Sequence, residues 1–436
     1  MKYKPTILII VGITGDLSKR KLLPAIEAIA KKGEIPEQFK IVGVTRQSNI
    51  KLEDLLINTS NKEYLRDNIE LFQMDLNDIK EYERLGNHLK QIEKEFDSSL
   101  QYLFYLSVPP VNSKSIIGLI GESGLAKRDG TKLLLEKPFG TDLESAKDLV
   151  SYIDKYFKME QVYRIDHYMA KETAQNIIIF RDGNSLFKRT WNKDFIERIE
   201  IIASEEIGIE GRANFYEQTG ALRDYVQSHL LQLASLALMN LPEDGKLEDV
   251  PLLRLEALKN LKVLNAKRGQ YKGYIDEVNN SKSYVETFAS INIESSDLNW
   301  KGVEINLITG KALREKSTEI KILYKKDKDH ESNELLLKLQ PDEGISFSVW
   351  VKTPGYEHEV SRHALNFSFK DSYSILPEAY EQVLWNAMNG DHSLFSTSEE
   401  VLETWRILDS LQKTWRDKGD NLIIYEKGST ISEIIN

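Results

Sequence analysis

The chain has 436 residues, with a charged fraction of 29% and a hydrophobic fraction of 41%, both ordinary for a globular protein of two or three domains. Its net charge of −10 argues against a general nucleic-acid binder, which normally presents a basic face. The absence of cysteine excludes disulfides, cysteine nucleophiles and thiolate metal ligands, and it fits a cytoplasmic location. No apolar run approaches the ~20 residues of a membrane span, and the start of the chain lacks a secretory signal pattern, so we expect no membrane association.

The first part of the chain alternates short apolar runs with helical patterns. The runs predict strands at residues 6–11, 40–45, 69–74, 102–107 and 131–136. Apolar residues at helical spacing follow the first and third runs, at 22–30 and 85–96. Alternating strands and helices indicate a parallel, doubly wound sheet of the Rossmann type.

After about residue 170 the pattern changes to strands without helices between them. Strand candidates lie at 199–204, 284–293, 303–308, 319–324, 334–339 and 345–351, and helical patterns at 221–238, 377–388 and 399–415. This indicates an α+β domain with one large, mostly antiparallel sheet. We therefore expect a nucleotide-binding domain at 1–165 and a second domain at 166–436.

The sequence GITGDL, Gly12 to Leu17, joins the first strand to the first helix. A glycine turn there lets the backbone approach a pyrophosphate beside the free N–H groups of the helix. Its Gly-x-x-Gly order is not the full dinucleotide fingerprint, so an ordinary turn remains an alternative. Arg46 stands at the end of the second strand. NADP sites place a basic residue there and NAD sites an acidic one, so NADP is the expected cofactor and NAD the second choice.

EKPFG, residues 136–140, ends the last strand of this domain, and Lys137 is expected to face the cofactor crevice. The alternative is a simple strand-ending turn.

RIDHYMAKE, residues 164–172, concentrates unlike polar groups. If the segment is helical, His167 and Lys171 share one face and, with Tyr168, suit an anion, while Asp166 could stabilise an imidazolium. A structural Asp–His pair is the alternative, and no metal site is expected because a compact third ligand is not evident.

GALRDYVQSHLLQLASLAL, residues 220–238, is an apolar helical segment that carries His229. A buried neutral histidine suits a general base, although a purely structural core histidine is the default interpretation. Asp224 precedes it by five positions, about 140° around an ideal α-helix, so the spacing alone does not bring the two together.

Taken together, these motifs resemble the glucose-6-phosphate dehydrogenase family over most of the chain. GITGDLSKRKLLPA, FYLSVPP, EKPFG, RIDHYMAKE and GALRDYVQSHLLQ stand in the family's order, and ITGKALREK, KLQPDEG and TWRILD extend the likeness into the second domain. RIDHY and RDYVQSHLLQ are specific in combination, whereas GITGDL is not.

The resemblance implies NADP-dependent oxidation of glucose 6-phosphate to a phosphogluconolactone, the start of the oxidative pentose phosphate route. It implies that His229 is the base and that Asp166 stabilises its imidazolium. The implied substrate-binding residues are His167, Tyr168, Lys171, Glu205, Asp224, Lys311, Lys316, Gln340 and Lys137. The implied cofactor-binding residues are Gly12, Gly15, Asp16, Leu17, Arg46, Tyr105 and Lys137. A homodimer or homotetramer formed through the large sheet is also implied.

Two alternatives differ from this interpretation. One is a sugar dehydrogenase of the glucose-fructose oxidoreductase type, which also joins a Rossmann domain to an antiparallel sheet; RIDHY with Lys171 argues instead for a substrate phosphate. The other is a catalytically silent NADP-binding regulator, against which Asp166, His167 and His229 argue.

The sequence also departs from the family pattern. The usual Leu-Gly after DHY is Met169-Ala170 here, and a second, structural NADP site is not expected in this shorter chain.

Overall fold

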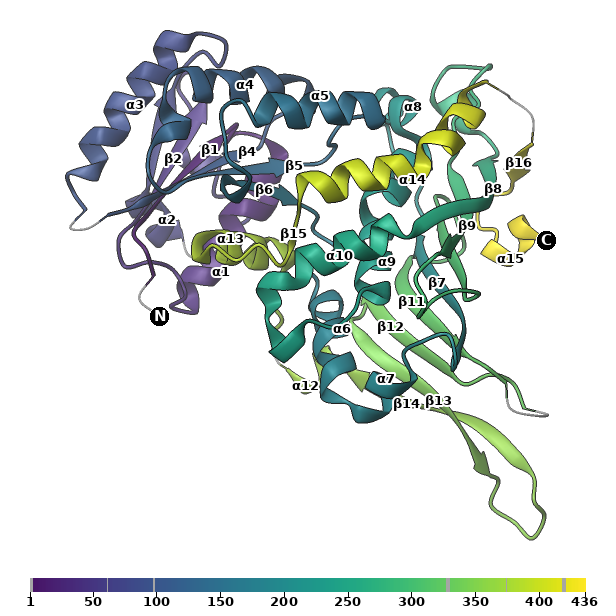
Figure 1. Ribbon diagram of the computed structural model, residues 1–436. Coiled ribbons are helices and arrows are strands. Elements are labelled where there is room, and N and C mark those ends of the chain that lie inside the picture. Colours follow the sequence, from purple (N-terminus) through teal and green to yellow (C-terminus); the bar gives the residue numbers. More distant parts are fainter. Residues whose placement is uncertain (1–2, 61, 97–98, 327–329, 374, 418–420) are drawn as a thin grey trace. The chain divides into compact units, whose positions relative to one another are not determined.

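The computed structural model describes residues 3–60, 62–96, 99–326, 330–373, 375–417 and 421–436 (Figure 1). The chain forms two compact units. Unit 1 comprises residues 1–140, 144–170 and 377–401, and unit 2 comprises residues 141–143, 171–376 and 402–436. Among the described helices, none combines the length and apolar character needed to cross a bilayer.

Unit 1 is built on a seven-stranded sheet in the order β15-β6-β5-β4-β1-β2-β3. Its strands are β1 (Thr6–Val11), β2 (Phe39–Thr45), β3 (Ile69–Gln73), β4 (Gln101–Leu106), β5 (Thr131–Glu136), β6 (Val162–Ile165) and β15 (Phe395–Ser396). All neighbours are parallel except β15, which runs antiparallel to β6. Every residue of β1 and β4 is buried, as the continuous apolar runs predict for strands covered on both faces.

Helices cover both faces of this sheet (Figure 1). They are α1 (Leu23–Lys31), α2 (Lys62–Asn68), α3 (Ile79–Glu93), α4 (Pro110–Glu122), α5 (Leu143–Ile153) and α13 (Ala379–Asn389), with a π-helix at Ser18–Leu22 and single 3₁₀ turns at Leu52–Asp54, Leu125–Lys127 and Met159–Gln161. The strand order reverses between β4 and β2 on either side of β1, and ligands of open α/β sheets bind outside the strands' carboxyl ends at such a point.

The segment 377–401 belongs to unit 1, although the sequence pattern predicts a second domain that runs from residue 166 to 436. Lys32 pairs with Glu381 at 2.7 Å. The Lys132 ammonium donates to the Ala387 carbonyl at 2.6 Å, and the Gln101 amide donates to the Met388 carbonyl at 2.8 Å. An ion pair near the start of α13 and hydrogen bonds to carbonyls at its carboxyl end thus hold this late segment in unit 1.

Unit 2 is built on a nine-stranded sheet in the order β14-β13-β12-β11-β7-β10-β9-β8-β16. Its strands are β7 (Ile196–Ser204), β8 (Leu261–Tyr271), β9 (Phe288–Ser295), β10 (Glu304–Gly310), β11 (Ser317–Tyr324), β12 (Glu334–Gln340), β13 (Gly344–Lys352), β14 (Val360–Ser368) and β16 (Leu422–Tyr425). The β7–β10 and β8–β16 pairs are parallel and the other pairs antiparallel. Alternating burial in β9, β11 and β12 reflects one well-covered face.

The helices of unit 2 are α6 (Glu172–Gly183), α7 (Ser185–Thr190), α8 (Ala213–Ala221), α9 (Leu231–Leu238), α10 (Val250–Lys259), α11 (Tyr274–Glu277), α12 (Phe369–Ser372), α14 (Ser398–Asp417, beginning in unit 1) and α15 (Ile431–Ile435), with 3₁₀ turns at Glu243–Gly245 and Leu247–Asp249. A π-helix at Leu222–Leu230 joins α8 to α9, where the sequence predicts one continuous helical segment. The expected fold class, a Rossmann-type unit and an α+β unit with a large, mostly antiparallel sheet, is confirmed.

Candidate functional site

In the glycine turn after β1, the backbone at Gly12 lies very close to the backbone at Ser107. Gly12 has a φ of +91°, and a Cβ there would lie 2.4 Å from the carbonyl oxygen of Ser107, which follows β4. Its N–H donates to the Val44 carbonyl at 3.0 Å, and the Gly15 N–H donates back to the Gly12 carbonyl at 2.9 Å. Only glycine fits at position 12, so the turn keeps its backbone open at the helix start. This cradle suits the pyrophosphate of a dinucleotide.

The first helix begins directly after this turn. Leu17 has helical backbone angles and precedes the π-helix, and Ser18 hydrogen-bonds to the Ser107 hydroxyl at 2.9 Å. Asp16 is exposed and pairs with Arg20 at 2.7 Å. The side chain of Asp16 is therefore part of a surface ion pair, and the backbone of the turn is the element that suits an anion.

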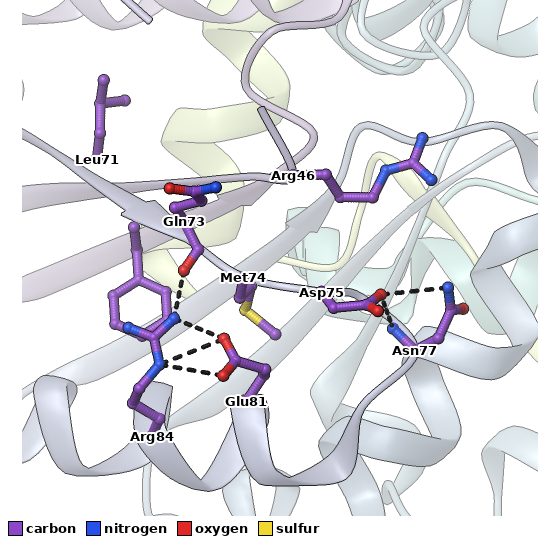
Figure 2. Close-up of a pocket in the computed structure, with 9 residues that line it drawn as sticks. Arg46, Leu71, Gln73, Met74, Asp75, Asn77, Glu81 and Arg84 are labelled. Atoms are coloured by element: carbon purple, nitrogen blue, oxygen red, sulfur yellow. Dashed lines mark hydrogen bonds and ion pairs between the residues drawn. The ribbon is translucent and has the colours of Figure 1, made fainter. Parts of the chain in front are cut away.

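Arg46 lines a pocket of about 800 Å³ together with residues of β3, the following loop and α3. Figure 2 shows Arg84 and Glu81 pointing toward one another from α3, while the Arg46 side chain extends away from them, on the side of Asp75 and Asn77. Arg84 pairs with Glu81 at 2.5 Å and covers the Phe72 ring at 4.1 Å. An exposed arginine in a pocket that Phe72 also lines suits the phosphorylated adenosine end of NADP.

The end of β5 carries Glu136 and Lys137. The Tyr105 hydroxyl donates to the Glu136 carboxylate, and Tyr105 itself is fully buried in the sheet. Burial raises the pKa of Glu136 to about 7, against the lowering effects of hydrogen bonds from Tyr105 and Tyr380 and of the Lys137 charge. Tyr105, predicted as a cofactor contact, thus holds the strand end from within the core. Lys137 is partly exposed and follows at the carboxyl edge of the sheet.

The segment after β6 is a turn rather than the helix considered for it. The Asp166 carboxylate accepts the Tyr168 N–H at 3.0 Å, and the Asp166 carbonyl accepts the Met169 N–H at 3.1 Å. Asp166 and Tyr168 are buried, whereas His167 is partly exposed and stacks near the Tyr380 ring at 6.4 Å. His167 therefore presents its ring by a turn geometry, and the shared helical face with Lys171 does not exist.

Lys171 stands at the N-terminus of α6 in unit 2. Its ammonium lies 3.7 Å from the Glu343 carboxylate, which also accepts the Thr173 N–H at 2.8 Å. Glu343 immediately precedes β13, and Gln340 ends β12 just before it. The segment that contains Gln340 is thus tied to Lys171 through Glu343.

The π-helix at Leu222–Leu230 carries both Asp224 and His229. Its backbone bonds join residues five apart, so a spacing of five spans about one turn and not the 140° of an α-helix. His229 is 1% exposed, and its ring meets the Tyr225 ring edge-on at 5.6 Å. The helix type, which the sequence pattern does not predict, places Asp224 and His229 about one turn apart along the helix.

Glu205 and Lys311 follow the carboxyl ends of the parallel strands β7 and β10, whose last residues, Ser204 and Gly310, are register partners. The buried Lys311 ammonium forms an ion pair with Glu205. The same ammonium lies 5.2 Å from the Tyr216 ring and 5.6 Å from the Tyr225 ring. The Glu205–Lys311 pair, Tyr225 and His229 thus form one chain of contacts, while Lys316 lies exposed before β11.

The structure groups the predicted residues by unit. Unit 1 holds Gly12, Gly15, Asp16, Leu17, Arg46, Tyr105, Lys137, Asp166, His167 and Tyr168, and unit 2 holds Lys171, Glu205, Asp224, His229, Lys311, Lys316 and Gln340. Asp166 and His229 belong to different units, so their pairing, like each residue's role, stays a prediction.

The further residues that contact the predicted ones include four with polar side chains of interest: Glu136, Tyr225, Glu343 and Tyr380. The first three lie inside motifs already noted, EKPFG, RDYVQSHLLQ and KLQPDEG, where their polar groups were a usable signal. Tyr380 lies outside every motif, and only the packing of 377–401 on unit 1 reveals it.

Comparison with known proteins agrees with this arrangement. Residues 9–176 match the family description "Glucose-6-phosphate dehydrogenase, NAD binding domain", and residues 178–434 match "Glucose-6-phosphate dehydrogenase, C-terminal domain". A glucose-6-phosphate 1-dehydrogenase of Chlamydia muridarum is 34% identical, with 94% of this chain and 90% of the relative covered. That of Borreliella burgdorferi is 33% identical, with 94% and 92% covered.

Solved structures give the same result. A glucose-6-phosphate dehydrogenase in complex with its substrate glucose-6-phosphate superposes with a TM-score of 0.91 at 29% identity, covering 99% of this chain and 96% of that one. The Mycobacterium avium glucose-6-phosphate 1-dehydrogenase gives 0.83 at 28% identity, covering 98% and 95%. The transcriptional regulator Gal80p of Kluyveromyces lactis, at 0.57 and 11% identity, shares the fold alone. The matches do not favour the glucose-fructose oxidoreductase alternative. The chain belongs to the glucose-6-phosphate dehydrogenase family, a family of oxidoreductases with a nicotinamide-nucleotide-binding domain.

Proposed function

We propose that this protein oxidises D-glucose 6-phosphate at C1 to 6-phospho-D-glucono-1,5-lactone, with NADP as the hydride acceptor. The observation that carries the proposal is the match of both units, over nearly the whole chain, to a dehydrogenase solved with glucose-6-phosphate bound. When bound, the nicotinamide supplies the acceptor for the hydride from C1.

His229 acts as the base in this proposal. Loss of hydride from a hemiacetal carbon builds positive charge there unless the hydroxyl proton leaves as well. A positioned imidazole that removes this proton contributes typically ~10²–10⁴-fold. An imidazole suits this role because its ordinary pKa lies near neutral pH. Asp166, fixed by its turn, stabilises the resulting imidazolium.

The sugar phosphate is held by Lys171, His167 and Tyr168. The Lys171–Glu343 ion pair supports this role, because it holds the ammonium in a defined position before a dianion arrives. Binding at the remote phosphate orients C1 for reaction. Glu205, Lys311 and Asp224, with Gln340 and Lys316, contact the sugar, and Lys137 contacts both sugar and nicotinamide.

NADP is the preferred cofactor in this proposal, with NAD as second choice. The position of Arg46 supports the preference, since a guanidinium at the end of the second strand suits the 2′-phosphate. The acidic Glu81 in the same pocket is paired with Arg84, so its charge is balanced locally.

The experiment is an absorbance assay at the reduced-nicotinamide band. Glucose 6-phosphate, glucose and a panel of other sugar phosphates are each tested with NADP and with NAD. Turnover confined to glucose 6-phosphate and faster with NADP is the expected result. Equal turnover of glucose would favour a sugar dehydrogenase of the other type. Tight NADP binding without any turnover would favour a silent regulator.

We further propose a cytoplasmic homodimer, with a homotetramer as the larger form. Exposed apolar residues on the edge strand β14, including Leu365 at 61% and Phe367 at 40%, support association through the large sheet. Light scattering of the purified protein measures the oligomeric state, and a monomer at micromolar concentration would contradict the proposal. Cell fractionation tests the location.

A further inference from the structure

Glu136 occupies a central place at the carboxyl edge of the first sheet. It is the last residue of β5 and is directly followed by Lys137. On the neighbouring strand it is in register with Ile165, which directly precedes Asp166. Glu136 therefore lies where β5 and β6 end, and these two strands are followed by the predicted site residues Lys137 and Asp166.

Two tyrosine hydroxyls converge on this carboxylate from opposite ends of the sequence. Tyr105 of β4 donates to Glu136, and Tyr105 is 0% exposed. Tyr380 of α13 also forms a side-chain hydrogen bond with Glu136. An ionised carboxylate only accepts hydrogen bonds and has two oxygens with which to do so, so both hydroxyls can donate to it in that state.

The contacts continue to the predicted site. The Tyr380 ring stacks near the His167 ring, with centroids 6.4 Å apart and an interplanar angle of 11°. The charges of Lys137 and Asp166 both act on Glu136. The groups that face Glu136 are thus Tyr105, Tyr380, Lys137 and Asp166, from β4, α13, the end of β5 and the turn after β6.

We propose that Glu136 is a positioning residue, whose ionised carboxylate holds Tyr105 and Tyr380 and thereby fixes Lys137, Asp166 and His167 at the edge of the sheet. This inference rests on the proposed function, since it assigns Glu136 a task in the same site. Glu136 acts through its neighbours and is not a catalytic residue.

Protonation would disturb this arrangement. A neutral carboxyl carries an O–H that needs its own acceptor, and its oxygens accept hydrogen bonds more weakly than those of a carboxylate, so protonation weakens the hold on the two tyrosine hydroxyls. Burial raises the pKa of Glu136 to about 7, which places the change inside the working range of most enzymes. The ionised state is therefore the competent one, and activity should fall on its protonation in addition to the fall caused by protonation of the base.

The test compares wild type with Glu136→Gln, Tyr380→Phe and the matched control Glu27→Gln. Glu27 is a buried carboxylate of α1 in the same unit, held by the Ser60 hydroxyl at 2.7 Å and paired with Lys31 at 2.7 Å. For each protein, kcat and KM for glucose 6-phosphate are measured against pH, and the Kd for NADP is measured in parallel by fluorescence.

In wild type we expect kcat/KM to fall below pH about 7 with a slope steeper than one ionisation gives. Glu136→Gln should lower kcat/KM several-fold, mainly through KM, and reduce the slope to that of one group. Tyr380→Phe removes a donor that lowers the pKa, so its acidic limb should move to higher pH. Glu27→Gln should leave the profile unchanged.

Unchanged profiles in both Glu136→Gln and Tyr380→Phe would overturn the proposal. If wild type turns over no sugar phosphate, the proposed function fails, and the NADP titration then decides the Glu136 inference separately. In that case an NADP Kd that weakens on acidification in wild type, and not in Glu136→Gln, supports it. An equal pH dependence of the Kd in the two proteins rejects it.

Discussion

The buried ammonium of Lys311 forms an ion pair with the partly exposed carboxylate of Glu205, at the carboxyl ends of two parallel strands within a mostly antiparallel sheet. The rings of Tyr216 and Tyr225 flank the ammonium. A paired cation at this position can present the carboxylate to sugar hydroxyls in a fixed orientation, so the pair connects the sheet to the proposed sugar site.

Lys311→Met should raise KM for glucose 6-phosphate at least tenfold, about 1.4 kcal/mol of binding. It should also destabilise the protein by about 1–3 kcal/mol, because the partly exposed Glu205 carboxylate loses its charged hydrogen-bond partner. The double variant Lys311→Met/Glu205→Gln should regain stability without regaining KM. Steady-state kinetics and chemical denaturation measure the two effects.

Lys427→Met, which breaks the exposed pair with Glu277 at 2.7 Å, is the control and should change neither the KM nor the stability. A normal KM in Lys311→Met would remove this residue from the substrate site.

His229→Asn should lower kcat by ~10²–10⁴-fold while leaving glucose 6-phosphate binding measurable, since the variant removes the proton acceptor and keeps a polar side chain. Turnover and calorimetric binding are compared with those of His392→Asn. His392 stacks on Tyr163 at 4.1 Å in unit 1 and has no proposed role in the reaction. Wild-type turnover in His229→Asn would show that another group is the base.

Arg46→Ala should weaken NADP binding more than NAD binding, by about 1–3 kcal/mol for a charge-assisted contact to phosphate. Cofactor titrations followed by fluorescence give both Kd values. The control is Arg66→Ala, which removes an exposed arginine paired with Glu53 at 2.8 Å outside the pocket. An equal loss for the two cofactors would exclude Arg46 as the reader of the phosphate.

Gly12→Ala should destabilise unit 1 and abolish tight cofactor binding. The positive φ costs about 1–3 kcal/mol for a side chain, and the Cβ would also collide with the Ser107 carbonyl oxygen at 2.4 Å. Gly33→Ala separates the two effects, because Gly33 has a φ of +72° and nothing within 4 Å of its Cβ position. Thermal unfolding and cofactor titration should show a smaller loss of stability and normal binding in Gly33→Ala. Normal cofactor affinity in a folded Gly12→Ala would contradict the cradle.

Stability should depend on pH through Glu136. Its pKa is raised from 4.5 to about 7 in the folded protein, so the folded state keeps a proton that the unfolded state releases between these values. The stabilisation is therefore complete below pH about 4.5 and is lost as pH rises through about 7, a change of about 3 kcal/mol. Glu136→Gln lacks this titration, so its denaturation midpoint should vary less with pH than that of wild type or Glu27→Gln. Parallel pH dependences in all three proteins would refute the assignment.

Several features were predictable from the sequence because they depend on local pattern. The continuous apolar runs of β1 and β4 predicted buried parallel strands, and GITGDL between a strand and a helix predicted the turn that needs glycine at position 12. The order of RIDHY and RDYVQSHLLQ along the chain indicates the family from the sequence alone. The strand that starts at Phe288 was expected to begin at residue 284, since apolar content extends beyond the paired residues.

Other features follow only from tertiary structure. Residue alternation shows which side of a strand is buried and not which strand pairs with it, so the parallel β7–β10 pair that joins Glu205 to Lys311 could not be foreseen. A π-helix differs from an α-helix in its hydrogen-bond register and not in any residue type, which hid the relation of Asp224 to His229. Tyr380 reaches Glu136 because 377–401 packs on a sheet formed more than 200 residues earlier. Sequence alone thus determined the strands and turns, because these depend on local interactions. Only folding decided that the Tyr105 and Tyr380 hydroxyls meet at Glu136, because packing alone brings such distant groups within hydrogen-bond distance.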